Sequence, residues 1–344
     1  MTVTVKTLAK AAGVSRGTVD RVLHNRGSVK KELALKIKTL AKELGYVPNR
    51  AGRALSGIRE HYKIGIMLPS IGNAFFDGVI EGIEKACLEY EELGVEVILD
   101  KIQGYDEATH LKSIDELKKK GCSALCLATI DTPSVAEKIK ECELLGIKII
   151  LVNSDVSNSN RICYVGSDYI KAGKTCAGLL SLISKFEKLK ILVVTGSAFM
   201  KGHRQRIEGF ENELQNLNVN FEICAQIESN DSDIKAQIET TKYLTAHKDI
   251  NCVYVTGAGV QGVGAAIIAT GRDDIVGIAF DDIYTTVEMV RAGIFKFVIC
   301  QQPDRQGYHA VKRAYQILSG TVNEQAMTEP FVSSFSDGKI TTKE

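Results

Sequence analysis

The chain has 344 residues, of which 44% are hydrophobic and 25% are charged, and its formal net charge is +1. These values are typical of a globular protein of two or three domains, and they exclude a disordered or fibrous chain. No apolar run reaches the ~18 residues that a membrane-spanning helix needs, and the N-terminus lacks a secretion signal, so we expect a cytoplasmic protein with no membrane partner.

The nine cysteines are dispersed between Cys87 and Cys300 and form no C-x-x-C pair. An odd number of cysteines without paired spacing predicts reduced thiols, as in the cytoplasm, and no metal site.

The two parts of the chain differ in charge. Residues 1–60 contain 13 Lys and Arg and 4 Asp and Glu, a net charge of +9, whereas the remaining residues contain 30 basic and 38 acidic side chains, a net charge of −8. A basic segment on an acidic body predicts a polyanionic partner, such as double-stranded DNA, for that segment alone.

Three short helices are predicted at the N-terminus, over residues 5–12, 16–24 and 31–44. Gly13 is suited to the left-handed residue that ends the first helix, and Ser15 can cap the second. Two helices joined by a tight turn, with a third packed across them, indicate a helix-turn-helix whose second helix enters the major groove of DNA. A three-helix bundle without that function would show the same apolar stripes, but the basic excess favours DNA binding.

Residues 48–60 are predicted to be a hinge between residues 1–47, the DNA-binding domain, and residues 61–344, the core. The stretch from 49 to 57, "NRAGRALSG", has helical potential but is shorter than the ~12–15 residues that an isolated helix needs.

From Lys63 onward, apolar runs alternate with amphipathic helical stretches, which predicts parallel sheets built from βαβ units. The predicted strands lie in 63–68, 95–100, 124–130, 147–153, 189–196, 251–257 and 274–280, and predicted helices include 78–90, 107–120, 133–145 and 204–216. Seven such units exceed one compact domain, so we expect an α/β core of two similar lobes behind an all-α head.

The head and hinge resemble those of the LacI family of bacterial transcriptional repressors, through "TVKTLAKAAGVSRGTVDRVLHNRGSV" and "KIKTLAKELGYVPNRAGRAL". The resemblance implies that Arg16, Gly17 and Arg21 lie at operator bases or phosphates, and that Leu55 wedges into the minor groove. It assigns DNA binding to Thr4, Ser15, Arg16, Gly17, Thr18, Asp20, Arg21, Asn49, Arg50, Arg53 and Leu55. Because Gly17 has no side chain and Asp20 replaces a frequent Ser, the operator sequence is not predicted.

The core resembles sugar-binding periplasmic proteins, which implies a type I two-lobed fold. The expected lobes are 61–160 with 302–326, and 161–301 with 327–344. The resemblance implies a ligand site of Asn73, Phe75, Phe76, Asn153, Asp168, Arg204, Gly257, Asp281 and Gln301. Here Arg204 is expected to bind the ligand, with its neighbour Arg206 in solvent. Two alternatives stay open: Asp168 as a helix N-cap, and the two Phe residues as core.

A rival function rests on "GAGVQG" at residues 257–262, which spells the G-x-G-x-x-G of dinucleotide sites. It follows the sixth predicted strand, whereas such a fingerprint opens the first βαβ unit of a cofactor domain. We therefore expect no enzyme and no cofactor. The resemblance implies a homodimeric regulator, most often a repressor, that binds a near-palindromic operator and whose core binds a sugar or sugar derivative. Release of DNA by the ligand is the commonest behaviour of the family, and corepression stays open.

Overall fold

A computed structural model describes residues 3–23, 29–44, 61–321, 331–333 and 340–342. The chain divides into two compact units, and the division falls between Glu60 and His61. The first unit contains α1 (Val5–Ala12), α2 (Arg16–Leu23) and α3 (Lys31–Glu43), which match the three predicted helices.

The N-terminal helices enclose a small apolar core. Its buried residues are Leu8, Ala9, Ala12, Val19, Val22 and Ile37. Gly13 ends α1 in the left-handed conformation, with φ 69° and ψ 31°, as its position predicts. This tight reversal sets α2 against α1, while Ile37 from α3 closes the core.

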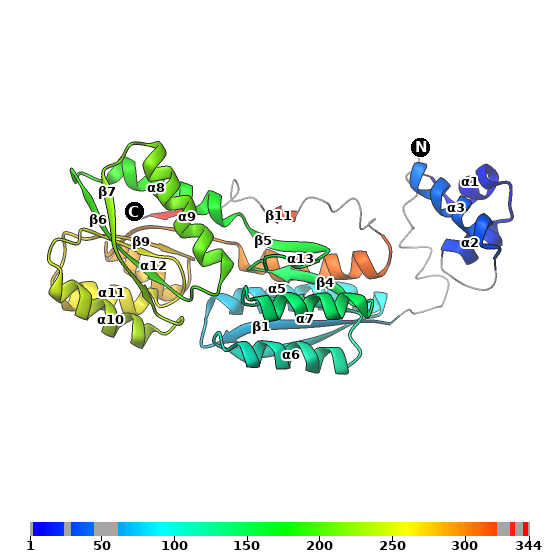
Figure 1. The fold of residues 1–344 in the computed structure, drawn as a ribbon, viewed down its shortest axis with the longest axis horizontal. Coiled ribbons are helices and arrows are strands. Elements are labelled where there is room, and N and C mark those ends of the chain that lie inside the picture. Colours follow the sequence, from blue (N-terminus) through cyan, green and yellow to red (C-terminus); the bar gives the residue numbers. More distant parts are fainter. Residues whose placement is uncertain (1–2, 24–28, 45–60, 322–330, 334–339, 343–344) are drawn as a thin grey trace. The chain divides into compact units, whose positions relative to one another are not determined.

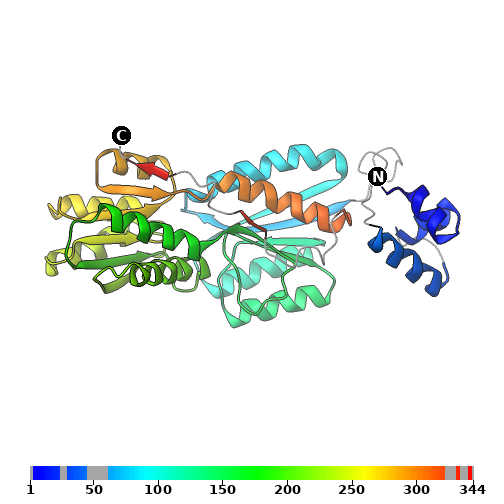
Figure 2. The same cartoon turned by 90° about the horizontal axis from the view of Figure 1, so that it is seen from above.

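The second unit consists of two lobes, each with a sheet between helices (Figures 1 and 2). The first lobe contains β1 (Tyr62–Ile71), α5 (Phe75–Tyr90), η1 (Glu91–Leu93), β2 (Val95–Gln103), α6 (Glu107–Lys119), β3 (Ala124–Leu127), α7 (Pro133–Leu144), β4 (Lys148–Val152), β5 (Cys163–Ser167), α13 (Pro303–Leu318) and β11 (Phe331–Ser333). The second contains α8 (Tyr169–Ile183), β6 (Leu189–Thr195), α9 (Lys201–Asn216), β7 (Phe221–Glu228), α10 (Asp233–Ala246), β8 (Cys252–Val255), α11 (Val260–Ala269), β9 (Val276–Phe280), α12 (Tyr284–Arg291), β10 (Phe295–Ile299) and β12 (Ile340–Thr342).

The two sheets of the described residues have matching topology. Their strand orders are β11-β5-β4-β3-β1-β2 and β12-β10-β9-β8-β6-β7, and all pairs are parallel except β10 with β12. Both faces of each sheet are covered by helices, so that two apolar clusters form in each lobe. This explains why the central strands are apolar at successive positions rather than alternating.

Neighbouring helices approach closely where glycine replaces a side chain. An added Cβ at Gly82 in α5 would lie 1.9 Å from the carbonyl oxygen of Asp304, at the start of α13. The second lobe repeats this arrangement, since a Cβ at Gly173 in α8 would lie 2.1 Å from the carbonyl oxygen of Arg206 in α9.

The α/β class, the parallel sheets and all seven predicted strands are confirmed, but the predicted lobe boundaries need correction. β5 pairs with β4 in the first sheet, although residues 161–301 were assigned to the second lobe. The C-terminal segment also divides, because β11 joins the first sheet and β12 the second. β5, β7 and β10 were not predicted: β7 is a half-exposed edge strand, and the exposed Lys296 interrupts the apolar run of β10.

Candidate ligand pocket and nucleic-acid interface

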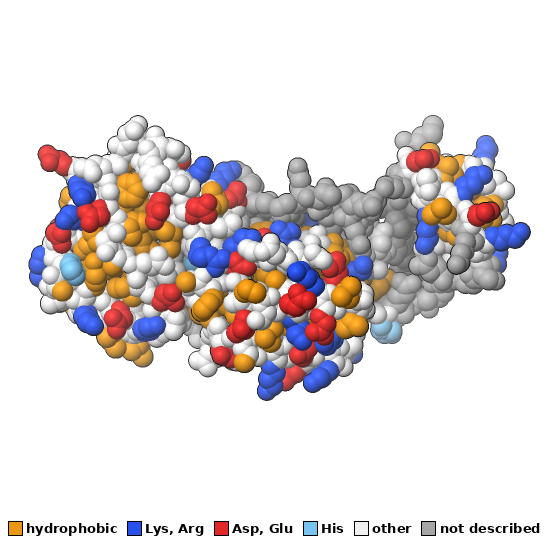
Figure 3. Space-filling model, in the orientation of Figure 1, with side chains coloured by type: hydrophobic (Ala, Val, Ile, Leu, Met, Phe, Trp, Pro, Cys, Tyr) orange, Lys and Arg blue, Asp and Glu red, His pale blue; other side chains and the backbone are white. Residues whose placement is uncertain are grey.

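The exposed side of α2 is the candidate nucleic-acid interface. Arg16, Gly17 and Arg21 are exposed there, whereas Thr18 and Asp20 are half-buried. Arg21 is held along the helix, because its Nε donates to the carbonyl oxygen of Gly17 at 3.2 Å. Lys and Arg side chains stand at the surface of this unit in Figure 3. The positive charge needed for phosphate contacts is therefore present beside the exposed helix.

Two of the expected phosphate ligands are helix caps. The hydroxyl of Thr4 accepts a hydrogen bond from the backbone N–H of Thr7 at 3.2 Å, and that of Ser15 accepts one from Thr18 at 3.1 Å. Both residues are exposed, so a cap that fixes its helix can also face DNA. Asn49, Arg50, Arg53 and Leu55 lie outside the described residues.

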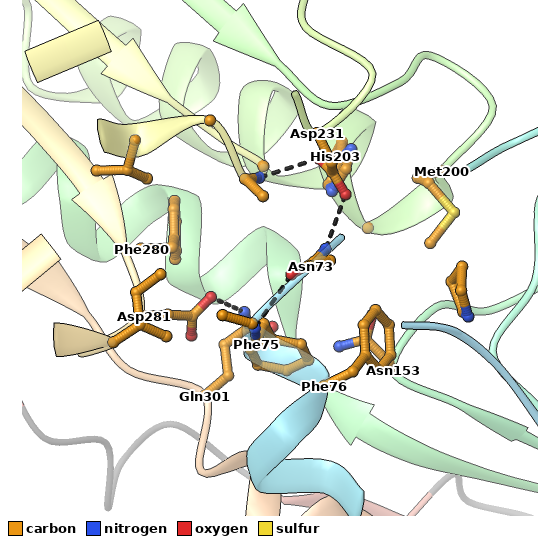
Figure 4. Close-up of a pocket in the computed structure, with 18 of the residues that line it drawn as sticks. Asn73, Phe75, Phe76, Asn153, Met200, His203, Asp231, Phe280, Asp281 and Gln301 are labelled. Carbon is orange, nitrogen blue, oxygen red and sulfur yellow. Dashed lines mark hydrogen bonds between the residues drawn. The ribbon is translucent and has the colours of Figure 1, made fainter. Parts of the chain in front are cut away.

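A cavity of about 200 Å³ lies where the carboxyl ends of strands from both sheets meet, which is where open α/β sheets bind ligands. Its lining includes seven of the nine expected ligand residues: Asn73, Phe75, Phe76, Asn153, Gly257, Asp281 and Gln301. Figure 4 shows six of these side chains around one cavity, which segments far apart in the sequence bring together.

Several buried polar atoms of this lining lack a partner within the described protein. They are Nε of Arg206, Oδ1 of Asp281 and Oε1 of Gln301. The side chains of Arg206 and Gln301 are only 3% and 4% exposed. Unpaired polar groups at such depth cost free energy, and a polar ligand that both donates and accepts hydrogen bonds would satisfy them.

Asp281 and Arg206 determine the electrostatics of one side of the pocket. Burial raises the pKa of the Asp281 carboxyl to about 6, while the positive charge of Arg206 opposes this rise. A hydrogen bond of 2.7 Å from Nε2 of Gln301 holds Oδ2 of Asp281. The Arg206 guanidinium lies 3.8 Å from the ring centroid of Phe280. This cation–π contact stabilises the buried positive charge in a mostly apolar wall.

Asn153 and Asp281 take matching positions in the two lobes. Asn153 directly follows β4 and Asp281 directly follows β9, and both have a positive φ, 61° and 68°. Each backbone N–H donates at 2.9 Å to the neighbouring strand, to Val165 and Ile299 respectively. The left-handed residue at the end of a strand turns each side chain into the cavity.

Phe75 and Phe76 lie at the start of α5 and not on a strand, so both can line the pocket and also pack into the first core. Their rings meet edge to face, with centroids 5.3 Å apart. Successive residues of a helix turn by ~100° rather than 180°, so neighbouring rings can face the same side.

The expected roles of Arg204 and Arg206 are reversed. Arg204 is exposed and forms an ion pair with Asp131 of the first lobe, whereas Arg206 is buried in the pocket wall. Residues 204 and 206 lie on nearly opposite sides of α9, so the helix phase decides which one faces the cavity.

Asp168 is absent from the described lining. Its carboxylate caps α8 by accepting from the backbone N–H of Lys171 at 2.9 Å, so the helix-cap alternative is the one that the structure shows.

Sequence reasoning missed several lining residues, among them Tyr105, Tyr169, His203, Arg206, Asp231 and Phe280. Burial lowers the pKa of His203 to about 4, so this imidazole is neutral at pH 7. Tyr105 and Asp231 follow the edge strands β2 and β7, and β7 was not predicted. For Tyr105 and Asp231, the signal that could have identified them is the position of a polar residue shortly after a strand.

The "GAGVQG" loop has a packing role. The backbone N–H of Gly262 donates to Oδ1 of Asp233 at 3.0 Å, so a carboxylate of the chain already occupies the start of α11. A Cβ at Gly262 would lie 1.9 Å from the carbonyl oxygen of Asp233. These glycines therefore allow α10 and α11 to pack, and they do not form an open pyrophosphate cradle.

Among the described residues, no helix is long and apolar enough to cross a membrane. Within the same part of the chain, no three His, Cys, Asp or Glu side chains are grouped so that they could hold a metal ion.

Known proteins are similar to this chain over most of its length. Ribose import binding protein RbsB of Bacillus subtilis (strain 168) is 24% identical over 286 residues, which are 82% of this chain and 90% of that protein. The ribose operon repressor of Escherichia coli (strain K12) is 23% identical over 287 residues, 81% and 83% of the two chains. The crystal structure of GanP, a glucose-galactose binding protein from Geobacillus stearothermophilus, matches with a TM-score of 0.73 at 22% identity, covering 82% and 98%.

Family models match the two units separately. Residues 64–321, most of the chain, match the periplasmic binding protein domain, and residues 4–49 match the lacI family of bacterial regulatory proteins. The chain therefore belongs to the lacI family: it is a DNA-binding transcription regulator whose ligand-responsive core has the periplasmic binding protein fold.

Proposed function

We propose that the effector of this regulator is a sugar or sugar derivative that binds between Phe75, Asn153, Arg206, Asp281 and Gln301. The observation that carries the proposal is the set of unpartnered buried atoms on Arg206, Asp281 and Gln301, which offer one donor and two acceptors around one cavity. Vicinal hydroxyls match such mixed groups, and the rings of Phe75 and Phe76 offer apolar faces to the C–H side of a sugar.

The comparisons support this ligand class. Ribose is in the printed names of an import protein and of an operon repressor that are similar to this chain, and glucose and galactose are in that of the GanP structure. These names concern those proteins. For this chain, the supporting feature is the polar set at the ends of β4, β9 and β10.

The proposed regulator acts in the cytoplasm as a homodimer and is not an enzyme. Its two N-terminal units bind the halves of a near-palindromic operator, and effector binding changes the arrangement of the lobes so that the operator is released. A coupling of ~1–3 kcal/mol between the two sites is typical of such responses.

The test uses the full chain. A bound operator is first selected from a random double-stranded DNA library, and its affinity is then measured by fluorescence anisotropy with and without sugars, polyols, nucleosides and NAD(P). We expect at least one sugar to weaken operator binding by ~5–150-fold. A response to NAD(P) alone would contradict the proposed effector class. If the library yields no preferred DNA sequence, the proposal that the chain binds a specific operator is wrong.

A matched pair of variants separates the two sites. Arg16→Ala should weaken operator binding and leave the sugar-induced thermal shift unchanged, whereas Gln301→Ala should abolish the shift and keep operator binding. If Gln301→Ala responds to the sugar like the unmodified chain, the pocket is misassigned.

A further inference from the structure

Asp231 places a second carboxylate in the pocket, on the side away from Asp281 (Figure 4). It lies in the second lobe after β7, in the left-handed region with φ 57°. Its Oδ1 accepts from the backbone N–H of Ala258 at 3.0 Å. Its Oδ2 accepts from Nδ2 of Asn73 at 2.9 Å and from the hydroxyl of Tyr105, both in the first lobe. Donors from both lobes therefore fix the position of this carboxylate.

The hydrogen-bond partners of Asp231 carry no charge, although the charge of Arg206 acts on its neighbours Tyr105 and His203. Among the described residues, the three donors to this carboxylate are neutral, and no Lys or Arg forms an ion pair with it. Burial and the charge of Asp231 raise the pKa of Tyr105 well above its ordinary value, so the phenol stays protonated. Adjacent His203 is neutral at pH 7, because burial lowers its pKa to about 4.

Asp231 also has room for another donor. The two oxygens of a carboxylate offer about four acceptor positions, and the described donors occupy three of them. That a ligand belongs in this cavity is shown independently by the unpartnered atoms of Arg206 and Gln301, whose side chains are more than nine-tenths buried. The single guanidinium of the described lining, that of Arg206, lies against Phe280 and acts on Asp281, and it forms no described ion pair with Asp231.

We infer that Asp231 determines specificity, and that the pocket selects an effector with a protonated amine, such as an amino sugar, over its neutral and anionic counterparts. This inference rests on the proposed sugar site. An ammonium group supplies the cation that Asp231 lacks, and a hydrogen bond between two ionised groups is stronger than one to a hydroxyl. A phosphate or carboxylate on the ligand would meet Asp231, Asp233 and Asp281 against one arginine.

The experiment compares matched sugars on the full chain by isothermal titration calorimetry at pH 7. The pairs are D-glucose with D-glucosamine and with 3-amino-3-deoxy-D-glucose, D-galactose with D-galactosamine, and D-mannose with D-mannosamine. N-acetyl derivatives serve as neutral controls of similar size, and D-glucose 6-phosphate as an anionic one. We expect at least one amino sugar to bind about tenfold or more tightly than its parent and its N-acetyl derivative.

The variant Asp231→Asn keeps the shape of the side chain and removes its charge, so the preference for that amine should fall to about twofold or less. The control is Asp273→Asn, which removes an exposed carboxylate of the same lobe that lies outside the described pocket lining. Thermal unfolding verifies that both variants are folded.

The outcomes separate this inference from the proposed function. If neutral sugars bind and no amine binds more tightly than its parent, the amine selectivity is wrong and the sugar site stands. An amine preference that survives Asp231→Asn, or that Asp273→Asn abolishes equally, also overturns the role of Asp231. If no sugar of either kind binds, the proposed function fails, and this inference fails with it.

Discussion

The two lobes carry different residues at matching positions. In the first lobe Asn153 directly follows β4, and in the second Asp281 directly follows β9, which has the same place in the order of its sheet. Around them the first lobe contributes neutral amides and aromatic rings, from Asn73, Phe75 and Phe76, whereas the described charged groups of the pocket, Arg206, Asp231, Asp233 and Asp281, all come from the second. Two lobes of the same topology therefore line the pocket with chemically different side chains. For the proposed effector site, this difference would make the second lobe discriminate the charge of the effector and the first lobe supply shape and hydrogen bonds.

The largest effect is expected at Arg206. Arg206→Met should weaken binding of the sugar found in the screen at least ~100-fold, because it removes a buried donor and leaves Asp281 without a nearby cation. Arg204→Met, two residues away and exposed, is the matched control for calorimetry. If Arg204→Met loses as much affinity for the sugar, the affinity depends on the total charge of α9, and the proposed contact between Arg206 and the sugar is wrong.

Asp281→Asn should abolish effector binding and yet stabilise the free protein. The pKa of Asp281 in the folded state is about 6, above the ordinary 3.8, so ionisation at pH 7 opposes folding by up to about 3 kcal/mol. The charges facing it, Arg206 and Asp282, are unchanged in the variant. We expect the gain in the free energy of unfolding, measured in urea, to be full above pH 6 and to vanish towards pH 4. A gain that is equal at pH 4 and pH 7 would refute a desolvated carboxylate.

Helix packing tests whether the two lobes are built alike. Gly82→Ala and Gly173→Ala each place a Cβ against a backbone carbonyl, at 1.9 and 2.1 Å, and should destabilise by ~1–3 kcal/mol. Gly178→Ala in α8 meets nothing within 4 Å and should stabilise by ~0.5 kcal/mol. Thermal unfolding measures all three variants. A loss confined to one lobe would show that the matching topology does not imply matching packing.

The smallest effect is expected where the lobes meet at the ion pair between the exposed Arg204 and the buried carboxylate of Asp131. Arg204→Ala removes the bridge to Asp131, whose carboxylate keeps the N–H and hydroxyl of Ser157 as donors, so the loss of stability should stay below ~1 kcal/mol. Effector affinity should fall by less than about threefold, because this bridge favours the closed lobes without contacting the ligand. Lys188→Ala, which breaks an exposed pair within the second lobe, should leave the affinity unchanged in calorimetry.

Local signals in the sequence determined the N-terminal helices and the seven apolar strands. The nine expected ligand residues came from the resemblance instead, and seven of them line the described cavity. Thr4, Gly13 and Ser15 begin or end helices through hydrogen bonds to residues close to them in the sequence. Buried parallel strands are recognised by their continuous apolar runs. These features depend on neighbours along the chain, so they can be read without knowing the fold.

Only the tertiary structure decided which arginine faces the pocket, that Asp168 caps a helix, and that β5 belongs to the first sheet. Arg204 and Arg206 differ by the phase of one helix, which is fixed when Gly173 and Gly209 let α8 and α9 pack together. Asp231 gains its role from Asn73 and Tyr105, 158 and 126 residues away. Contacts across the cleft depend on how two lobes meet, and no pattern within a segment encodes that.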